Sequence, residues 1–386
     1  MQRKSFSVTI PLIKELCKIF KATLLLGLLL TACALTSTEH QETTSVPSDT
    51  AMPPTPVLAM ALPTSTVTLV SPTATPGPTA TVMSSATAIP SPIPSFTPDP
   101  YAPFTIDALS SRVYGGGELQ IVETQERTEQ FARYLITYPS DGLTIIGFMN
   151  VPHEGSKFPV VIMLHGYVPP SEYETLAYTQ RYADALAEAG YFVIHPNMRN
   201  FPPSDEGPDD FRSGLAVDVL NLIAIIREQS QDPEGPLRRA DTEDINLWGH
   251  SMGGGVALRV AVVNNAPYIK TAVLYGAMSG DERLNYGRIL EWSEGERGEF
   301  ELAAPSEAMQ AISPIDHLDR LNAAISIHHG DADQTVPPQW SDDLCRRLER
   351  AGHDVQCAMY QGAPHTFNGV WDDVFMERVG RFIDRY

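Results

Sequence analysis

Six short apolar runs, separated by segments with helical character, constrain the fold of this chain more than any other feature. The runs are Pro159–Leu164, Tyr191–His195, Ile245–Trp248, Thr271–Tyr275, Ala324–His328 and Val355–Tyr360. Continuous apolar strands of this kind are typical of sheets that are buried on both faces. Helices are expected over Ser171–Ala189, Gly214–Gln229, Met252–Asn264, Pro338–Ala351 and Val370–Ile383. Strands that alternate with helices predict an α/β fold with a mostly parallel central sheet and helices on both faces.

Two segments depart from this alternation. The domain begins with three expected strands, Glu118–Glu123, Phe131–Tyr138 and Leu143–Val151. Residues 278–313 are rich in Glu and Gly and fit no crossover helix, so we expect a small cap insertion there. Residues 105–386 are enough for one large α/β domain.

The N-terminus has the features of an export signal. Five basic residues precede the apolar run Ala22–Thr31, which is too short to span a bilayer that needs about 20 apolar residues. The run leads into Leu30-Thr31-Ala32-Cys33, which resembles the bacterial lipobox, in which the cysteine is lipidated and becomes the mature N-terminus. We therefore predict a signal peptide over residues 1–32, a lipid anchor on Cys33, and an exported protein tethered to the bacterial cell membrane. The alternative is an ordinary secretory signal in which Cys33 is incidental.

Proline is concentrated between this signal and the domain. Residues 34–104 hold 14 of the 32 prolines, together with many Ser and Thr residues and few charges. Proline has a fixed φ and no N–H, which disfavours both helix and sheet. We expect residues 33–104 to form a disordered, extended tether.

Composition and charge exclude two classes of protein. Hydrophobic residues make up 43% of the chain, which rules out a wholly disordered protein. The formal net charge is −20, from 27 Lys and Arg against 47 Asp and Glu. Nucleic-acid binding through a basic surface is therefore not expected.

The strongest motif is Gly249-His250-Ser251-Met252-Gly253, which lies directly between an expected strand and an expected helix. The motif matches the G-x-S-x-G nucleophile elbow, which is specific only when a strand precedes it and a helix follows it, as expected here. Glycines on either side of the serine allow the tight turn, and the helix N-terminus favours a developing negative charge. Ser251 is therefore the candidate nucleophile, and His250 is expected to have a structural or hydrogen-bonding role.

A serine at its ordinary pKa is a poor nucleophile, so a base and an orienting acid are required. The strand Ala324–His328 leads into a loop that offers two acids, Asp331 and Asp333. The strand Val355–Tyr360 is followed by a loop that contains His365. In enzymes with this elbow the acid and the histidine follow the serine in that order, so Asp331 or Asp333 is the candidate acid and His365 is the candidate base.

Three segments resemble the α/β hydrolases of the dienelactone-hydrolase and prolyl-oligopeptidase-like group: GHSMGG at 249–254, HGDADQTVP at 329–337 and GAPHTF at 362–367. The resemblance covers about Leu143 to Tyr386. It implies an α/β-hydrolase fold and a Ser-His-Asp triad. The family's acid maps onto Asp333, with Asp331 as the second choice, and its catalytic histidine maps onto His365.

Two backbone amides are expected to form an oxyanion hole. One is the N–H of Met252, the residue after the nucleophile. By resemblance to the family, the other is the N–H of Tyr167, in the loop after the strand Pro159–Leu164. True prolyl oligopeptidases carry a tyrosine where this sequence has His165, and the Pro-rich segment cannot build their N-terminal propeller. Both departures favour a carboxylic-ester hydrolase over a peptidase.

The resemblance therefore implies a serine hydrolase that forms an acyl-enzyme intermediate on a small ester, with no cofactor. A serine peptidase acting on short peptides is the alternative, and a non-catalytic surface binding protein is a third reading. No Cys, His and Asp cluster has metal-ligand spacing, and His328 and His329 are not expected to bind metal. Cys345 and Cys357 form either a disulfide or two free thiols. The oligomeric state is left open.

Overall fold

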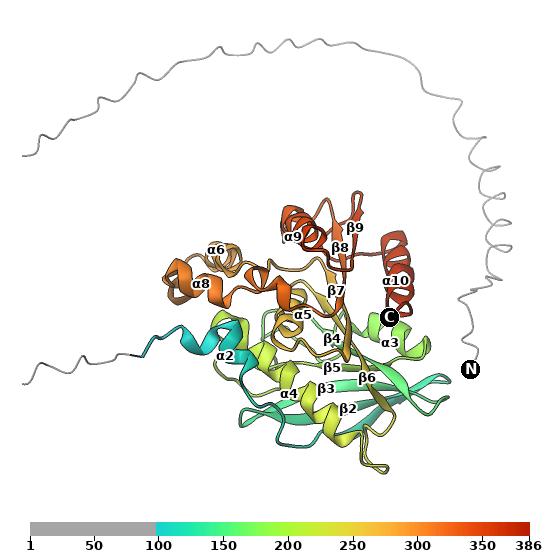
Figure 1. The fold of residues 1–386 in the computed structure, drawn as a ribbon. Coiled ribbons are helices and arrows are strands. Elements are labelled where there is room, and N and C mark those ends of the chain that lie inside the picture. The colour runs from blue at the N-terminus through green and yellow to red at the C-terminus, as the bar shows by residue number, and fades with distance from the viewer. Residues whose placement is uncertain (1–97) are drawn as a thin grey trace, which may run out of the picture. The chain divides into compact units, whose positions relative to one another are not determined.

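Nine strands form one sheet in the computed structural model, which describes residues 98–386 (Figure 1). The strands are β1 (Gln120–Arg127), β2 (Phe131–Ser140), β3 (Leu143–Pro152), β4 (Phe158–Leu164), β5 (Phe192–Pro196), β6 (Ala240–His250), β7 (Ile269–Tyr275), β8 (Ala324–Gly330) and β9 (Val355–Tyr360). The α-helices are α2 (Ile106–Ser110), α3 (Gln180–Glu188), α4 (Ser213–Gln229), α5 (Met252–Val263), α6 (Glu282–Trp292), α7 (Glu299–Leu302), α8 (Ser306–Ile312), α9 (Pro338–Ala351) and α10 (Val370–Ile383).

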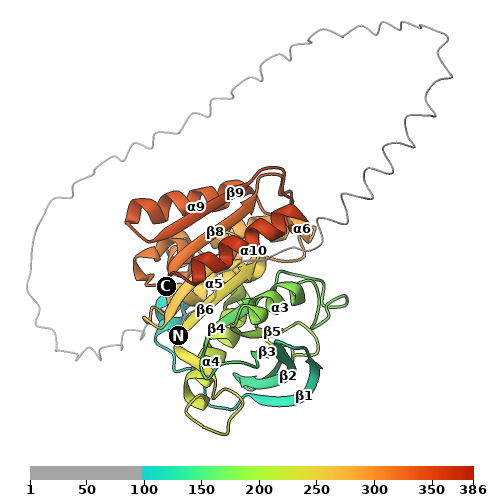
Figure 2. The same ribbon diagram turned by 90° about the vertical axis from the view of Figure 1, so that its right-hand side faces the viewer.

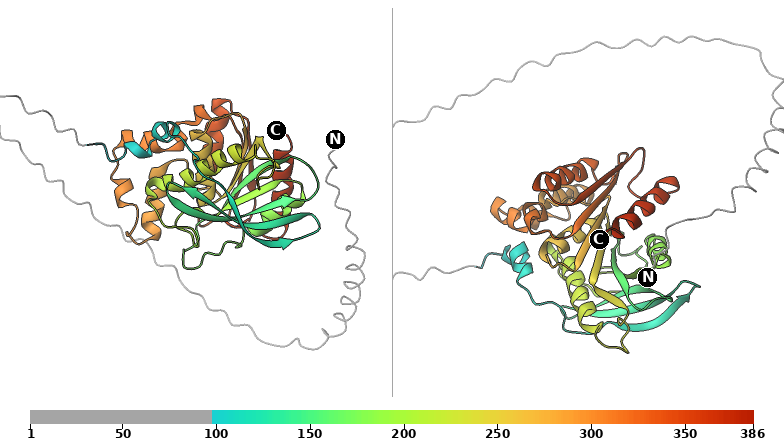
Figure 3. Two further views of the ribbon diagram at one scale, coloured as in Figure 1. Left: turned by 90° about the horizontal axis from the view of Figure 1, so that it is seen from below. Right: turned by 45° about the vertical axis from the view of Figure 1, so that its right-hand side comes forward.

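The sheet is mostly parallel, as the sequence predicted. Its strand order is β1-β2-β3-β5-β4-β6-β7-β8-β9. In this order, the first three pairs, which join β1, β2, β3 and β5, are antiparallel. The remaining pairs, which join β5, β4, β6, β7, β8 and β9, are parallel. Figure 3 shows the antiparallel strands at one end of the sheet and the C-terminal elements at the other. The parallel part positions the candidate site, because the expected functional loops all follow its strands.

Helices cover both faces of the parallel strands (Figure 2). One hydrophobic cluster joins the sheet to α4, α5 and α9, through side chains such as Leu220, Val260 and Leu348. A second cluster joins the opposite face to α3 and α10, through Leu186 and Phe375 among others. This layering confirms the predicted fold class, an α/β-hydrolase fold.

The helix expected over Ser171–Ala189 is shorter in the structure, where α3 spans only Gln180–Glu188. The preceding residues form turns whose side chains bind buried groups elsewhere. The Tyr173 hydroxyl donates to Asn197 Oδ1 at 3.1 Å, and the Tyr178 hydroxyl accepts from the Gly166 amide at 2.6 Å. These tertiary contacts override the local helical pattern.

The ordered domain begins before residue 105, so the last residues of the expected tether belong to the fold. Ala102–Phe104 form a 3-10 turn. The ring of Phe104 lies 5.4 Å from that of Phe211, and the ring of Tyr101 lies 5.2 Å from that of Phe300. Aromatic packing therefore outweighs the prolines on either side of Tyr101. The expected signal peptide, Cys33 and the rest of the tether lie outside the described residues.

Between β7 and β8, where we expected a cap, the chain forms α6, α7 and α8. A buried ion cluster attaches them to the rest of the domain. Glu282, the first residue of α6, contacts Arg212 Nη2 at 2.5 Å and Arg259 Nη2 at 2.6 Å. Arg259 lies on α5, and Arg212 directly precedes α4. Over residues 98–386, none of the helices combines the length and apolar character that crossing a membrane would require.

Candidate active site

Ser251 lies in a strained turn between β6 and α5. Its φ of 55° and ψ of −116° are rarely adopted by a residue other than glycine. A Cβ at Gly249 would lie 2.2 Å from the Gly253 carbonyl oxygen, and a Cβ at Gly253 would lie 2.3 Å from that of Leu164. Only glycine fits at these two positions, so the sequence motif and the sharp turn are one feature.

Asp333 and His365 lie in the loops that follow β8 and β9, and they form a direct hydrogen bond. His365 Nδ1–H donates to Asp333 Oδ2 at 2.6 Å. The other carboxylate oxygen, Oδ1, accepts from the amides of Thr335 at 2.8 Å and Val336 at 2.9 Å. Of the two acids that the sequence offered, Asp331 instead accepts from the Gly362 amide at 2.6 Å. The structure therefore brings Asp333, and not Asp331, to the histidine.

The surroundings of Asp333 keep its carboxyl ionised. Burial would raise its pKa, but hydrogen bonds from His329 and His365 and from the Val336 amide outweigh burial and hold the pKa well below its usual range. A buried anion beside His365 Nδ1 holds the ring so that Nε2 is left to accept a proton. It also stabilises the imidazolium that forms when Nε2 does so.

His329 also contacts Asp333, which the sequence analysis did not predict. Its Nε2 lies 3.0 Å from Asp333 Oδ2 and 3.1 Å from the Val336 carbonyl oxygen. Both partners can only accept, so Nε2 carries the hydrogen, and Nδ1 accepts from the Ser341 hydroxyl at 2.6 Å. His329 and His365 therefore both contact the Oδ2 oxygen of Asp333. No local sequence signal separates His329 from its neighbour His328.

One expected oxyanion donor lies at the start of α5 and the other in the loop after β4. Met252 is the first residue of α5, so its N–H has no acceptor within the helix. Tyr167 follows β4, which pairs with β6 such that Leu164 is opposite Gly249. The first turn of α5 also abuts the loop after β4, as the lack of space for a Cβ at Gly253 shows. A Cβ at Gly166, the residue before Tyr167, would lie 3.1 Å from Ser251 Cβ, so this loop approaches the candidate nucleophile.

The α6–α7 segment borders the loops of this site. The Arg297 guanidinium donates to the Tyr167 hydroxyl at 3.4 Å, and that of Arg288 donates to the Gln334 carbonyl oxygen at 3.3 Å. The Arg288 guanidinium also lies 5.1 Å from the centre of the Trp292 ring. Tyr167 belongs to the loop after β4 and Gln334 to the loop after β8, so this segment contacts both loops.

The two cysteines of the described domain are joined. Cys345 on α9 and Cys357 on β9 form a disulfide, with their Cα atoms 6.4 Å apart. Together with Glu349 they form the one cluster of metal-ligand type within residues 98–386, and both of its sulfur atoms are taken up by the disulfide. The buried His328 binds Ser326 and Tyr360, and no metal-ligand cluster of the described domain includes it.

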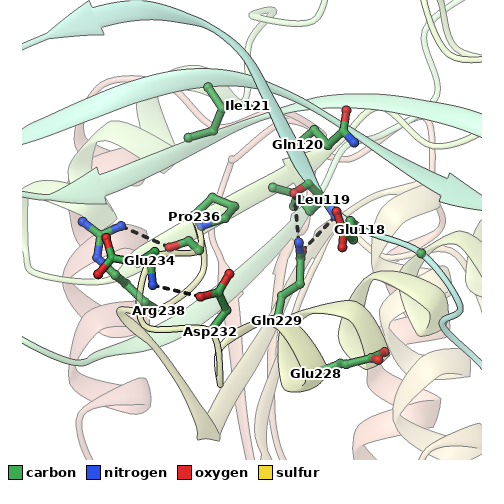
Figure 4. Close-up of a pocket in the computed structure, with 12 residues that line it drawn as sticks. Glu118, Leu119, Gln120, Ile121, Glu228, Gln229, Asp232, Glu234, Pro236 and Arg238 are labelled. Atoms are coloured by element: carbon green, nitrogen blue, oxygen red, sulfur yellow. Dashed lines mark hydrogen bonds between the residues drawn. The ribbon is translucent and has the colours of Figure 1, made fainter.

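A cavity of about 640 Å³ lies away from these residues (Figure 4). It lies between the start of β1 and the end of α4, where Gln229 Oε1 accepts from the Leu119 amide at 2.8 Å. This is the edge of the sheet where β6 begins. Ser251 follows the other end of β6, so the cavity is not part of the candidate site.

Comparison with known proteins agrees with the observed fold. A family model for the α/β hydrolase fold matches residues 159–300, and one for the prolyl oligopeptidase family matches residues 237–385. A Synechocystis protein provisionally named a carboxymethylenebutenolidase is 23% identical over 244 residues, which are 60% of this chain and 85% of that protein. An uncharacterised Bacillus subtilis peptidase, YtmA, is 22% identical over 239 residues, 61% of this chain and 86% of its own.

Among solved structures, acetyl xylan esterase 1 from Thermoanaerobacterium superimposes with a TM-score of 0.52 at 17% identity, covering 72% of this chain and 92% of the esterase. At that identity the likeness shows the fold alone. The two family models together extend from β4 to the last helix, and they include all three candidate triad residues. The chain is thus an α/β hydrolase of the group that contains the dienelactone hydrolases and the catalytic domains of the prolyl oligopeptidases.

Proposed function

We propose that this protein is a serine hydrolase that cleaves carboxylic esters by acyl transfer. Ser251 is the nucleophile, His365 is the general base, and Asp333 orients His365. The observation that carries the proposal is the 2.6 Å hydrogen bond between His365 and Asp333, on the same sheet edge as Ser251. The strained backbone of Ser251 supports it, because strain of this kind costs about 1–3 kcal/mol and persists where a turn is functional.

In the proposed reaction, His365 Nε2 takes the proton of the Ser251 hydroxyl as the oxygen attacks the ester carbonyl. The negative oxygen of the tetrahedral intermediate accepts hydrogen bonds from the amides of Met252 and Tyr167. His365 then gives its proton to the departing alcohol, which leaves an acyl-enzyme. A water molecule deprotonated by His365 releases the acid and regenerates Ser251.

The names of the relatives and one sequence feature favour an ester over a peptide. The Synechocystis relative is provisionally named a carboxymethylenebutenolidase, and one structural neighbour is named an acetyl xylan esterase. His165 also replaces the tyrosine of the true prolyl oligopeptidases. The match to the prolyl oligopeptidase family model and the similarity to YtmA support a second candidate, a serine peptidase that acts on small peptides.

The test is hydrolysis of p-nitrophenyl acetate and of longer acyl esters by the wild type and by Ser251→Ala. Loss of at least about a thousandfold in kcat is expected, because the remaining site lacks its nucleophile. Ser111→Ala, which changes an exposed serine at the end of α2, is the matched control. Full activity of Ser251→Ala would refute the proposal. Faster cleavage of prolyl or aminoacyl amides than of esters would favour the peptidase.

We also propose that the protein is exported and held at the cell membrane through a lipid on Cys33. The support is the order of basic leader, short apolar run and cysteine in the sequence. Cell fractionation tests it. Cys33→Ser should move the enzyme from the membrane fraction to a soluble fraction, and an unchanged membrane fraction would contradict the anchor.

A further inference from the structure

We propose that Tyr178 and His250 form a hydrogen-bonded relay that positions the oxyanion loop relative to the loop that carries His365. Both are positioning residues that act through the backbone of other residues. The inference rests on the proposed function, since it concerns the stabilisation of the transition state in that reaction.

Three hydrogen bonds make up the relay. The Gly166 amide donates to the Tyr178 hydroxyl oxygen at 2.6 Å. The Tyr178 hydroxyl lies 3.0 Å from His250 Nδ1, and His250 Nε2 lies 3.1 Å from the carbonyl oxygen of His365. The relay therefore runs from the loop after β4, through the elbow, to the loop after β9.

The chemistry of the partners fixes the direction of each bond. A carbonyl oxygen can only accept, so His250 Nε2 carries the ring hydrogen and donates it to His365. Nδ1 of the neutral ring is then an acceptor, and it receives the single hydrogen of the Tyr178 hydroxyl. That hydroxyl oxygen accepts from Gly166. For a neutral His250 ring, every donor in the relay thus has one acceptor, and no other direction satisfies all three contacts.

The relay ends on the peptide next to a proposed oxyanion donor. Gly166 directly precedes Tyr167, whose amide is one of the two proposed donors. A Cβ at Gly166 would lie 2.6 Å from the Tyr178 hydroxyl and 3.1 Å from Ser251 Cβ, so this backbone fits closely between the relay and the nucleophile. The Gly166 carbonyl lies 2.7 Å from His165 Nδ1. The N–H of Gly166 is hydrogen-bonded and its C=O lies against the His165 ring, so both groups constrain the direction of the next amide.

The relay also stays uncharged while His365 changes charge. The rings of His250 and His365 have centres 4.7 Å apart. Burial, and next the proximity of His365, lower the pKa of His250 to about 3. A protonated His250 at this distance would oppose protonation of His365, whereas the neutral ring allows it. The position thus needs a neutral side chain that both accepts and donates a hydrogen bond.

Tyr178→Phe is the sharpest test, because it removes one oxygen atom and keeps the ring that packs against His250 at 5.5 Å. Displacement of an oxyanion donor should lower kcat for a p-nitrophenyl ester about tenfold to a hundredfold while KM changes less than about threefold. Affinity for a trifluoromethyl ketone, which forms the tetrahedral adduct, should fall by the same factor as kcat/KM. A purely structural role would not make these two quantities fall together.

Tyr191→Phe is the matched control, because it also removes a single tyrosine hydroxyl. Tyr191 directly precedes β5, away from the candidate site, and its hydroxyl donates to Asp384 at 2.6 Å. It should leave kcat within about twofold. At the second relay residue, His250→Gln keeps an amide that can donate and accept, whereas His250→Leu keeps neither. We expect His250→Gln to be about tenfold more active than His250→Leu. This pair carries the test if Tyr178→Phe does not fold.

The inference is overturned if Tyr178→Phe matches Tyr191→Phe in kcat, or if His250→Leu is as active as His250→Gln. Failure of the proposed function has a different signature. In that case the wild type itself would neither hydrolyse the esters nor react with a fluorophosphonate at Ser251. The inferred role of the relay would then be refuted together with the proposed function.

Discussion

Replacement of Glu282 by glutamine should destabilise the domain strongly, although Glu282 is not a candidate site residue. Its side chain is 2% exposed, and those of its partners Arg212 and Arg259 are 9% and 1% exposed. Each carboxylate oxygen contacts one guanidinium. Glutamine keeps the shape but removes the charge, so Glu282→Gln takes away the carboxylate that contacts both buried guanidinium groups.

The expected size of the effect follows from this geometry. Breaking a buried ion pair by neutralising one partner costs about 3–5 kcal/mol. One carboxylate here serves two guanidinium groups, which places the expected loss of unfolding free energy at the upper end, at about 5 kcal/mol. Arg259 keeps its bond to the Ile312 carbonyl oxygen at 3.0 Å, which limits the loss. A change of this size is a large part of the total stability of a domain, which is about 5–15 kcal/mol.

Equilibrium unfolding in urea measures this loss directly. Glu377→Gln is the matched control, because Glu377 is 59% exposed and pairs with Arg381 on the surface of α10. The control should change the unfolding free energy by less than about 0.5 kcal/mol. Addition of Arg212→Gln to Glu282→Gln should recover part of the loss, since one buried guanidinium group instead of two then lacks this carboxylate. A loss below about 1 kcal/mol for Glu282→Gln would refute the reasoning, because the two arginines would then not depend on this carboxylate.

Three further predictions concern the site and its support. Gly276 has a φ of +50°, and a Cβ there would lie 3.3 Å from His365 Nδ1. Gly276→Ala should therefore displace the His365 ring and lower kcat for a p-nitrophenyl ester about tenfold. An unchanged kcat would contradict the close contact. Replacement of both Cys345 and Cys357 by serine opens a ring of 12-residue separation and should cost about 3 kcal/mol in urea unfolding, whereas no change would show that the disulfide is absent in solution. The pKa of His250 is about 3 in the folded protein and about 6.5 in the unfolded protein. Below pH 6.5 the unfolded state therefore binds a proton that the native state does not, and the unfolding free energy decreases as the pH is lowered. Between pH 7 and pH 5 the wild type should therefore lose about 2 kcal/mol more unfolding free energy than His250→Gln, and equal losses would refute the low pKa.

The parallel sheet and its order of functional loops were predictable because each depends on a local pattern. Ser251 lies in a motif whose glycines are required by the turn itself, and the loops with Asp333 and His365 follow apolar strands that are plain in the sequence. The choice of Asp333 over Asp331 needed the family resemblance at first. In the structure it follows from where each carboxylate finds amide donors.

Contacts between distant loops were not predictable in the same way. Tyr178 falls within a stretch that reads as helix, and only its bonds to Gly166 and His250 show why the helix begins later. Nothing local distinguishes His329 from its neighbour His328, although one supports Asp333 and the other binds Tyr360. These assignments depend on which strands become neighbours, and that information is spread over the whole chain.

The disulfide between α9 and β9 has a consequence for proteolysis. It spans an exposed turn around Gly352, the kind of place where proteases cut first. A single cut there would separate the chain into one piece with Ser251 and Asp333 and another with His365. The disulfide would keep the two pieces covalently joined, so a nicked enzyme would run as one band on a non-reducing gel and as two after reduction. Loss of activity after such a cut would then depend on the redox state of the surroundings and not on the cut alone.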